Sequence, residues 1–288
     1  MPGEPPRALP VTAPLFGGET LGSYLTRLAQ DNAMRTRALL SRIHPSLAHL
    51  EITPMTDTAA RWPPAAFDRL TTLTGRRQDH LAAAIPALCD AHRDTTSPSP
   101  PGFIRACRRC AAAKNITVLI YLRARPHDHL CTRHRRWLRA LRDIDISALP
   151  EITAAQRRHD RAARQHDDLL LADIHRRTRD TVLDWCDGQW HPALQRTWQK
   201  RAERLRISIL PIHQQRSMLD VVIHPEHLQV ASTLLKLTQQ PNAKLKALEN
   251  LARRLQLPED ALAPTSRDPI HRHLQPVPSP MRGLSFRG

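Results

Sequence analysis

The sequence predicts a mainly α-helical protein with a small zinc-binding segment in its middle. Three observations support this fold class. Apolar residues recur at helical spacing through most of the chain, only one run of residues is strongly β-prone, and four cysteine and histidine residues have the spacing of metal ligands. With 288 residues, the chain is long enough for two modest domains that each bury a core.

The first part of the chain, residues 1–94, is expected to be a helical, helix-turn-helix-like module. Thr20 can cap a helix over about 20–31, and a second short helix fits 36–43. Their lengths suit a helix-turn-helix unit, although most short helix pairs serve only for packing.

Two more helices are expected before a module boundary. Pro63 and Pro64 can open the third helix, which Gly75 can end, and a fourth fits 78–85. The connector at 95–101 is rich in Pro, Ser and Thr, which favour turns over helix.

The rest of the chain divides into three parts. Residues 95–150 are expected to form a zinc-ribbon segment, with one short hairpin strand at 117–122 because this run is β-prone. Residues 151–256 are expected to form a C-terminal helical bundle with helices at 154–186, 191–206, 225–239 and 242–256. Residues 257–288 contain six prolines and little apolar content, so a disordered tail is expected.

Four residues have the pattern of a structural zinc site. Cys107 and Cys110 form a C-x2-C pair, and after 20 residues Cys131 and His134 form a C-x2-H pair. Two residues between ligands let a tight turn present both side chains to one ion, and the intervening loop can bring the second pair alongside the first. We expect one structural Zn²⁺, and Cys3His donors leave no open coordination position for catalysis.

Other ligand sets compete with this one. Cys89 and His92 form a second C-x2-H pair without a nearby partner pair, and His127 or His129 could replace His134. Cys186 is expected to be an ordinary thiol, as is Cys89.

An enzymatic role is less well supported by the sequence. A zinc deaminase would need H-x-E followed by P-C-x-x-C; His49 and Glu51 give the first part far upstream, but Ala106 stands where Pro is needed. No P-loop, nucleophile elbow or paired-carboxylate motif is present. We therefore expect a protein that is not an enzyme.

The charge of the chain points to a nucleic-acid partner. The formal net charge is +16, and residues 101–142 contain eleven basic residues but one acidic residue. A solvated surface normally mixes both signs, so this concentration favours contacts with phosphates. The candidate nucleic-acid-binding residues are Arg35, Arg37, Arg105, Arg108, Arg109, Arg123, Arg125, Arg133, Arg135, Arg136 and Arg139.

The chain is expected to be cytoplasmic and nucleoid-associated. Its first 30 residues have neither a basic start nor a continuous apolar run, and no segment approaches 18 uninterrupted apolar residues. No membrane partner is therefore expected, and an odd count of five cysteines disfavours a disulfide framework.

Residues 10–140 resemble the TniQ family, whose members are encoded with bacterial transposition systems. The similarity lies in the segment Gly18–Ala29 followed by Asn32, in the run Leu70–Gly75, and in the two ligand pairs with their order and spacing. Many members continue with a further C-x2-C, which this chain lacks, so one zinc is expected and not two. The C-terminal half has no counterpart that we can name.

The resemblance implies a non-catalytic accessory protein. It would act as an adaptor that links DNA, or a guide RNA–protein complex, to an AAA+ transposition ATPase during target selection. A stand-alone zinc-containing DNA-binding regulator built from the same modules is the alternative. The sequence leaves open whether the chain forms a homodimer.

Overall fold

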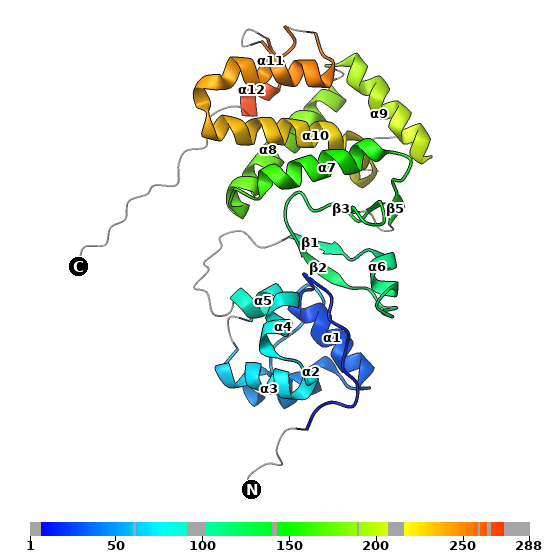
Figure 1. Cartoon of the computed structure of the whole chain (residues 1–288), viewed down its shortest axis with the longest axis vertical. Coiled ribbons are helices and arrows are strands. Elements are labelled where there is room, and N and C mark those ends of the chain that lie inside the picture. The colour runs from blue at the N-terminus through cyan, green and yellow to red at the C-terminus, as the bar shows by residue number, and fades with distance from the viewer. Residues whose placement is uncertain are drawn as a thin grey trace, which may run out of the picture. The chain divides into compact units, whose positions relative to one another are not determined.

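The computed structural model describes residues 7–59, 62–90, 102–139, 143–188, 190–206, 216–258, 260–263 and 266–273. It separates into two compact units, residues 1–145 and 146–288. The fold is mainly helical, as the sequence predicts, and two small antiparallel sheets lie in the first unit (Figure 1). The predicted connector at 95–101 and the tail beyond 273 lie outside the described residues.

The first two helices have the predicted bounds. α1 (Leu21–Asp31) begins after Thr20, whose hydroxyl accepts a hydrogen bond from the Ser23 N–H at 3.3 Å. Such a cap satisfies one of the N–H groups that the first helical turn leaves without a partner. α2 spans Thr36–Ile43, and the short helix η1 (Pro45–Leu47) follows it.

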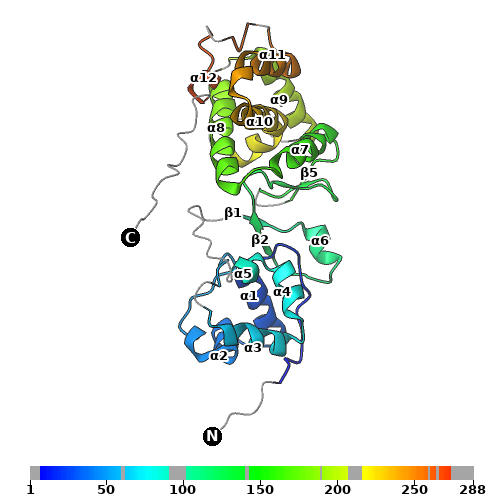
Figure 2. The same cartoon turned by 60° about the vertical axis from the view of Figure 1, so that its left-hand side comes forward.

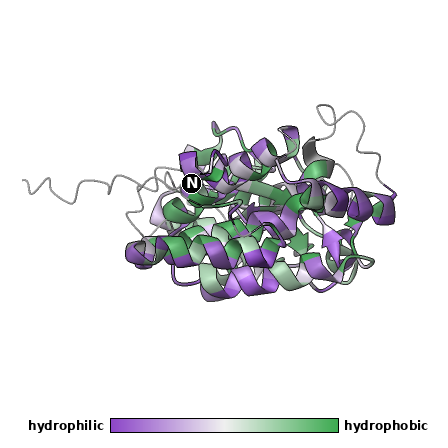
Figure 3. Ribbon diagram, turned by 90° about the horizontal axis from the view of Figure 1, so that it is seen from above, coloured by the Kyte–Doolittle hydropathy of each residue, from purple (hydrophilic) through white to green (hydrophobic). Residues whose placement is uncertain are grey.

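The next helices also follow their sequence signals. α3 (Pro64–Thr74) ends at Gly75, which has a φ of +61° and therefore adopts the left-handed conformation that favours glycine. α4 (Gln78–Ala84) lies within the predicted range 78–85, and α5 (Pro86–Asp90), which was not predicted, completes the module. Figure 3 shows hydrophobic and hydrophilic residues on the same helices, as is typical of helices that bury one face.

The inner faces of these helices bury one hydrophobic core. Tyr24, Leu25, Leu28, Leu39 and Leu40 are among its fully or almost fully buried members. Gly22 is required on the same helix, because a Cβ there would lie 1.9 Å from the carbonyl oxygen of Thr53. The core and this close approach fix α1 within the module.

The strands form two separate ladders. β1 (Gly102–Arg105) pairs antiparallel with β2 (Tyr121–Ala124). The second sheet has the order β3-β4-β5, with antiparallel pairing throughout. Its strands are β3 (Leu130–Cys131), β4 (Arg136–Trp137) and β5 (Ile144–Asp145).

The β-prone run at 117–122 forms a strand only at its end, which corrects the predicted position. Ile116 and Ile120 are buried in a small core beneath the helix α6 (Arg108–Ala112). The residues between them lie in a surface loop, where Val118 and Leu119 are 45% and 46% exposed. The run therefore has no strand partner until Tyr121, where pairing with β1 begins.

The N-terminal segment joins the helical module to the first ladder. The Arg123 N–H donates to Gly18 O and the Thr20 N–H donates to Tyr121 O, both at 2.9 Å. Glu19 thereby lies opposite Leu122 as an antiparallel neighbour. Backbone pairing thus makes the module and the ladder parts of one unit.

A buried ion pair lies beside this junction. The Glu19 carboxylate accepts hydrogen bonds from Arg27 Nε at 2.9 Å and Arg27 Nη2 at 2.7 Å, and from Ser23 Oγ at 2.8 Å. Glu19 and Arg27 are only 0% and 3% exposed. Each charge is therefore compensated by its partner, as burial requires.

The second unit is a helical bundle in which α10 contacts α7, α8, α9 and α11. Two views, in Figures 1 and 2, show α7, α8 and α10 packed side by side. The helices are α7 (Pro150–Ala163), α8 (Asp168–Asp187), α9 (Pro192–Leu205), α10 (Arg216–Gln239), η3 (Pro241–Ala243), α11 (Lys244–Leu255) and α12 (Ile270–His273).

The single helix expected at 154–186 is two helices, α7 and α8. Asp167 caps α8, because its carboxylate accepts the Leu170 N–H at 2.8 Å. The prediction of one helix was therefore wrong. The break contains no Gly or Pro that would have marked it in the sequence. The helix expected at 225–239 begins earlier, at Arg216, and carries Pro225 in its interior.

Packed structure continues beyond the expected boundary at 256. Leu257, Leu262 and Ile270 are buried, and the buried Asp268 carboxylate accepts hydrogen bonds from Trp185 Nε1 and from the Ile270 N–H. These contacts hold residues up to α12 against the second unit. Among the residues that the structure describes, no helix is both long enough and apolar enough to cross a membrane.

Candidate metal centre

The first ligand pair lies where a strand gives way to a helix. Cys107 follows β1 and occupies the N-cap position of α6, and Cys110 lies within that helix. Asp143 supports this turn, because its carboxylate accepts the Arg108 N–H at 3.0 Å. Both thiols therefore belong to the first turn of α6.

The second ligand pair lies at a tight turn. Cys131 ends β3, and His134 lies in the turn that leads to β4. Arg135 closes this turn with a φ of +51°, in the left-handed region. The ring of His129 packs against the fully buried Trp137 at a centroid distance of 5.3 Å, which anchors the ladder beside the turn.

The structure brings the four predicted ligands together. Cys107 Sγ, Cys110 Sγ and Cys131 Sγ lie 3.5, 3.1 and 3.7 Å from His134 Nδ1, and Cys110 Sγ lies 3.7 Å from Cys131 Sγ. In a tetrahedral zinc site with Zn–S near 2.3 Å and Zn–N near 2.0 Å, ligand atoms are about 3.5–3.8 Å apart. The spacing and the donor types therefore fit one tetrahedral metal ion such as zinc.

The chemistry of the thiols favours the same interpretation. Burial and the neighbouring Cys131 and Cys107 raise the pKa of Cys110 to about 12, and burial likewise raises the pKa of Cys107. Three crowded thiolates repel one another, so they need a cation among them. A thiolate-binding metal supplies that charge, and its binding releases the thiol protons.

The competing ligands lie elsewhere. Cys89 is exposed, Cys186 is buried in the second unit, and neither belongs to the four-residue cluster. His127 and His129 are buried and do not belong to this cluster. His92 lies outside the described residues.

The predicted basic residues divide into two groups. Arg123 is half-buried and forms an ion pair with Asp57, and Arg136 pairs with Asp145 at 3.0 Å across β4 and β5. Arg105 is also half-buried. The exposed members are Arg35, Arg37, Arg108, Arg109, Arg125, Arg133, Arg135 and Arg139.

These ion pairs were missed by reasoning from the sequence. Their acidic partners lie at residues 57 and 145, outside the segment 101–142 in which the positive charge was counted. The pairing is visible only once the chain is folded. We call the exposed residues Arg108, Arg109, Arg133 and Arg135, which flank the four ligands, the arginine rim.

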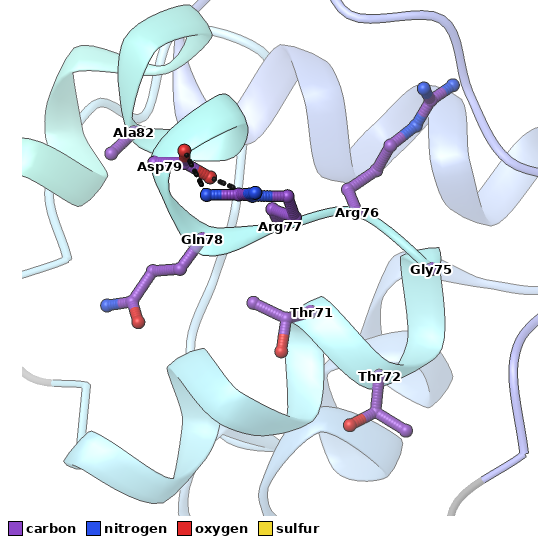
Figure 4. Close-up of a pocket in the computed structure, with 8 residues that line it drawn as sticks. All are labelled: Thr71, Thr72, Gly75, Arg76, Arg77, Gln78, Asp79 and Ala82. Atoms are coloured by element: carbon purple, nitrogen blue, oxygen red, sulfur yellow. Dashed lines mark hydrogen bonds and ion pairs between the residues drawn. The ribbon is translucent and has the colours of Figure 1, made fainter.

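A pocket of about 770 Å³ lies away from the metal cluster, between the end of α3 and the start of α4 (Figure 4). Arg77 Nε and Nη2 donate to the two carboxylate oxygens of Asp79 at 3.0 and 2.9 Å. This contact holds the pKa of Asp79 below its ordinary value. The lining residues are Thr71, Thr72, Gly75, Arg76, Arg77, Gln78, Asp79 and Ala82, so the pocket offers polar contacts but no metal-ligand set.

No protein-family model, curated protein or solved structure matches this chain.

Proposed function

We propose that the protein is a non-catalytic, zinc-containing nucleic-acid-binding adaptor of the TniQ type. It links DNA, or a guide RNA–protein complex, to an AAA+ transposition ATPase during target selection. The observation that carries the proposal is the Cys3His cluster flanked by the arginine rim. The resemblance of residues 10–140 to TniQ proteins supplies the transposition context.

Zinc has a structural role in this proposal. The ligands come from α6 and from the turn between β3 and β4, and the small core beneath α6 contains few large side chains, Ile116 and Ile120 among them. A core of this size contributes little stability, so a metal ion is the expected substitute for hydrophobic burial. With four protein ligands, no position is left for a reactive water.

The arginine rim is the surface proposed to contact phosphates. Arg108 and Arg109 lie on the first turn of α6, and Arg133 and Arg135 lie on the turn that contains His134. Ligands that bind one ion hold these two backbone segments close together, so the four guanidinium groups present charge from a fixed surface. Guanidinium groups bind phosphate in a bidentate manner, and such contacts favour affinity over sequence specificity.

The adaptor role requires surfaces for protein partners as well. The second unit has its own helical core, separate from the zinc cluster, and it extends well past residue 145. In the first unit, α1 and α2 form the pair proposed as helix-turn-helix-like, with Arg35 and Arg37 exposed. These parts are the proposed contacts to the assembly and the ATPase.

Neutralising the arginine rim tests the nucleic-acid role. In a variant with Arg108, Arg109, Arg133 and Arg135 all changed to Ala, DNA affinity should fall, and the slope of log affinity against log salt should decrease by up to about 3.6, since each phosphate contact contributes about 0.9. Binding is measured by fluorescence anisotropy over a range of salt concentrations, after zinc content is shown to equal that of the wild type.

A matched control separates local contacts from net charge. The exposed residues Arg157, Arg158, Arg161 and Arg164, on and just after α7, give a variant with the same loss of four charges. This control should retain most of the affinity and of the salt slope. Equal effects of the two variants, or no effect of the first, would show that the arginine rim is not the binding surface.

A further inference from the structure

Three packed helices of the second unit bury histidines that the proposed function does not use. His159 lies on α7, His175 on α8, and His224 and His227 on α10. Their exposed fractions are 0%, 4%, 0% and 6%. Buried histidines need specific partners for their ring nitrogens, so their mutual arrangement is informative.

Two of these rings present the same nitrogen to each other. His159 Nε2 lies 2.9 Å from His175 Nε2, and the ring planes are 85° apart. Two nitrogens at this distance must share either a proton or a cation, because two lone pairs facing each other repel. Which of the two is shared depends on the protonation of the other ring nitrogens.

The other nitrogen of each ring has a hydrogen-bonding partner on α10. His159 Nδ1 lies 3.1 Å from Ser232 Oγ, and His175 Nδ1 lies 3.3 Å from His227 Nε2. When both Nδ1 atoms donate to these acceptors, both Nε2 atoms carry a lone pair and no proton, 2.9 Å apart. This is the outer-shell arrangement typical of metal-binding histidines, in which a second hydrogen bond fixes the tautomer and the ring orientation.

We propose that His159 and His175 bind a second metal ion through their Nε2 atoms. Neutral imidazole suits the borderline cations Zn²⁺, Co²⁺ and Ni²⁺. Tetrahedral ligand nitrogens are about 3.3 Å apart, so the two Nε2 atoms need to separate by about 0.4 Å and the rings need to tilt until both lone pairs point at the ion. Two histidines fill half of such a site, and water or another donor group takes the remaining positions.

This second site is distinct from the Cys3His cluster. It lies in the second unit, and its donors are two nitrogens instead of three thiols and one nitrogen. It should therefore bind metal more weakly than the thiolate site. It should also survive the loss of a cysteine ligand, because no ligand is shared.

Cobalt is the probe for this site, because its spectrum separates the two donor sets. Metal-free full-length protein is titrated with Co²⁺ and the bound metal is counted after equilibrium dialysis. The wild type should bind two equivalents, the first with intense sulfur-to-cobalt charge-transfer absorption and the second without it. His159→Ala and His175→Ala should each bind only the first equivalent, whereas Cys110→Ser should bind only the second.

Two further variants keep the result interpretable. His227→Ala removes an outer-shell partner, and should weaken the second site by about 10–100-fold without abolishing it. His191→Ala removes another buried histidine of the second unit, one that pairs with Asp268, and should leave two equivalents bound. Circular dichroism checks that each variant is folded.

The proposal is overturned if the wild type binds only the equivalent that has the charge-transfer band, which would mean that a proton joins His159 to His175. It is also overturned if both single variants still bind two equivalents, or if His191→Ala alone removes the second. None of these outcomes bears on the Cys3His cluster, whose own test is the cobalt charge-transfer band.

Discussion

Replacing Cys110 with Ser is expected to abolish tight zinc binding and to unfold residues 105–138 locally. The hydroxyl of Ser is a poor zinc ligand, and the remaining donors cannot complete a tetrahedral site. Binding and folding of such a small metal-bound segment are one equilibrium, and apparent binding free energies for structural zinc are about 10–16 kcal/mol at pH 7. Loss of the ion therefore removes far more free energy than the small core under α6 provides.

Two measurements check this expectation. Elemental analysis of the purified wild type should find zinc in the Cys3His cluster, and this zinc should be missing in Cys110→Ser. Hydrogen exchange should show faster exchange at residues 105–138, with little change in α3, which has no backbone pairing with this segment among the described residues. Cys89→Ser is the matched control, because Cys89 is exposed and lies outside the cluster; normal zinc in Cys110→Ser, or loss of this zinc in Cys89→Ser, contradicts the ligand assignment.

Replacing Glu19 with Ala is expected to destabilise the first unit by about 3–5 kcal/mol, because it leaves the buried Arg27 charge without its partner. The same change removes the acceptor of the Ser23 hydroxyl at the junction with β2. Denaturant unfolding, followed by a probe within the first unit, measures the loss.

An exposed ion pair provides the comparison. Arg77 and Asp79 form a bidentate pair whose side chains are 77% and 58% exposed. Water solvates both charges once the pair is broken, so Asp79→Ala should change the stability very little. If Glu19→Ala and Asp79→Ala have the same small effect, the buried pair does not hold the junction together.

Local signals predicted the parts of the fold that depend on neighbours in the sequence. Thr20 predicted the start of α1 and Gly75 predicted the end of α3, because capping involves only the adjacent turn of helix. The C-x2-C and C-x2-H spacings predicted the members of the Cys3His cluster for the same reason. Each pair lies within one turn of the chain.

Long-range contacts could not be predicted in this way. The pairing of residues 18–20 with β2 joins segments about a hundred residues apart, and no periodic pattern marks it. The break between α7 and α8 has one local signal, the capping Asp167, which the absence of Gly and Pro obscured. The histidine pair between α7 and α8 depends on how those helices pack, so sequence spacing alone does not reveal it.

DNA binding by the zinc-loaded and the metal-free protein, measured over a range of salt concentrations, tests whether zinc organises the phosphate-contacting surface. If zinc holds the arginine rim in place, the loaded protein should bind a DNA duplex with a steep salt dependence. Removal of zinc should weaken binding and flatten the slope, and added Zn²⁺ should restore both. Equal affinity and equal slope in the two forms would contradict the account, because the surface would then not depend on the metal.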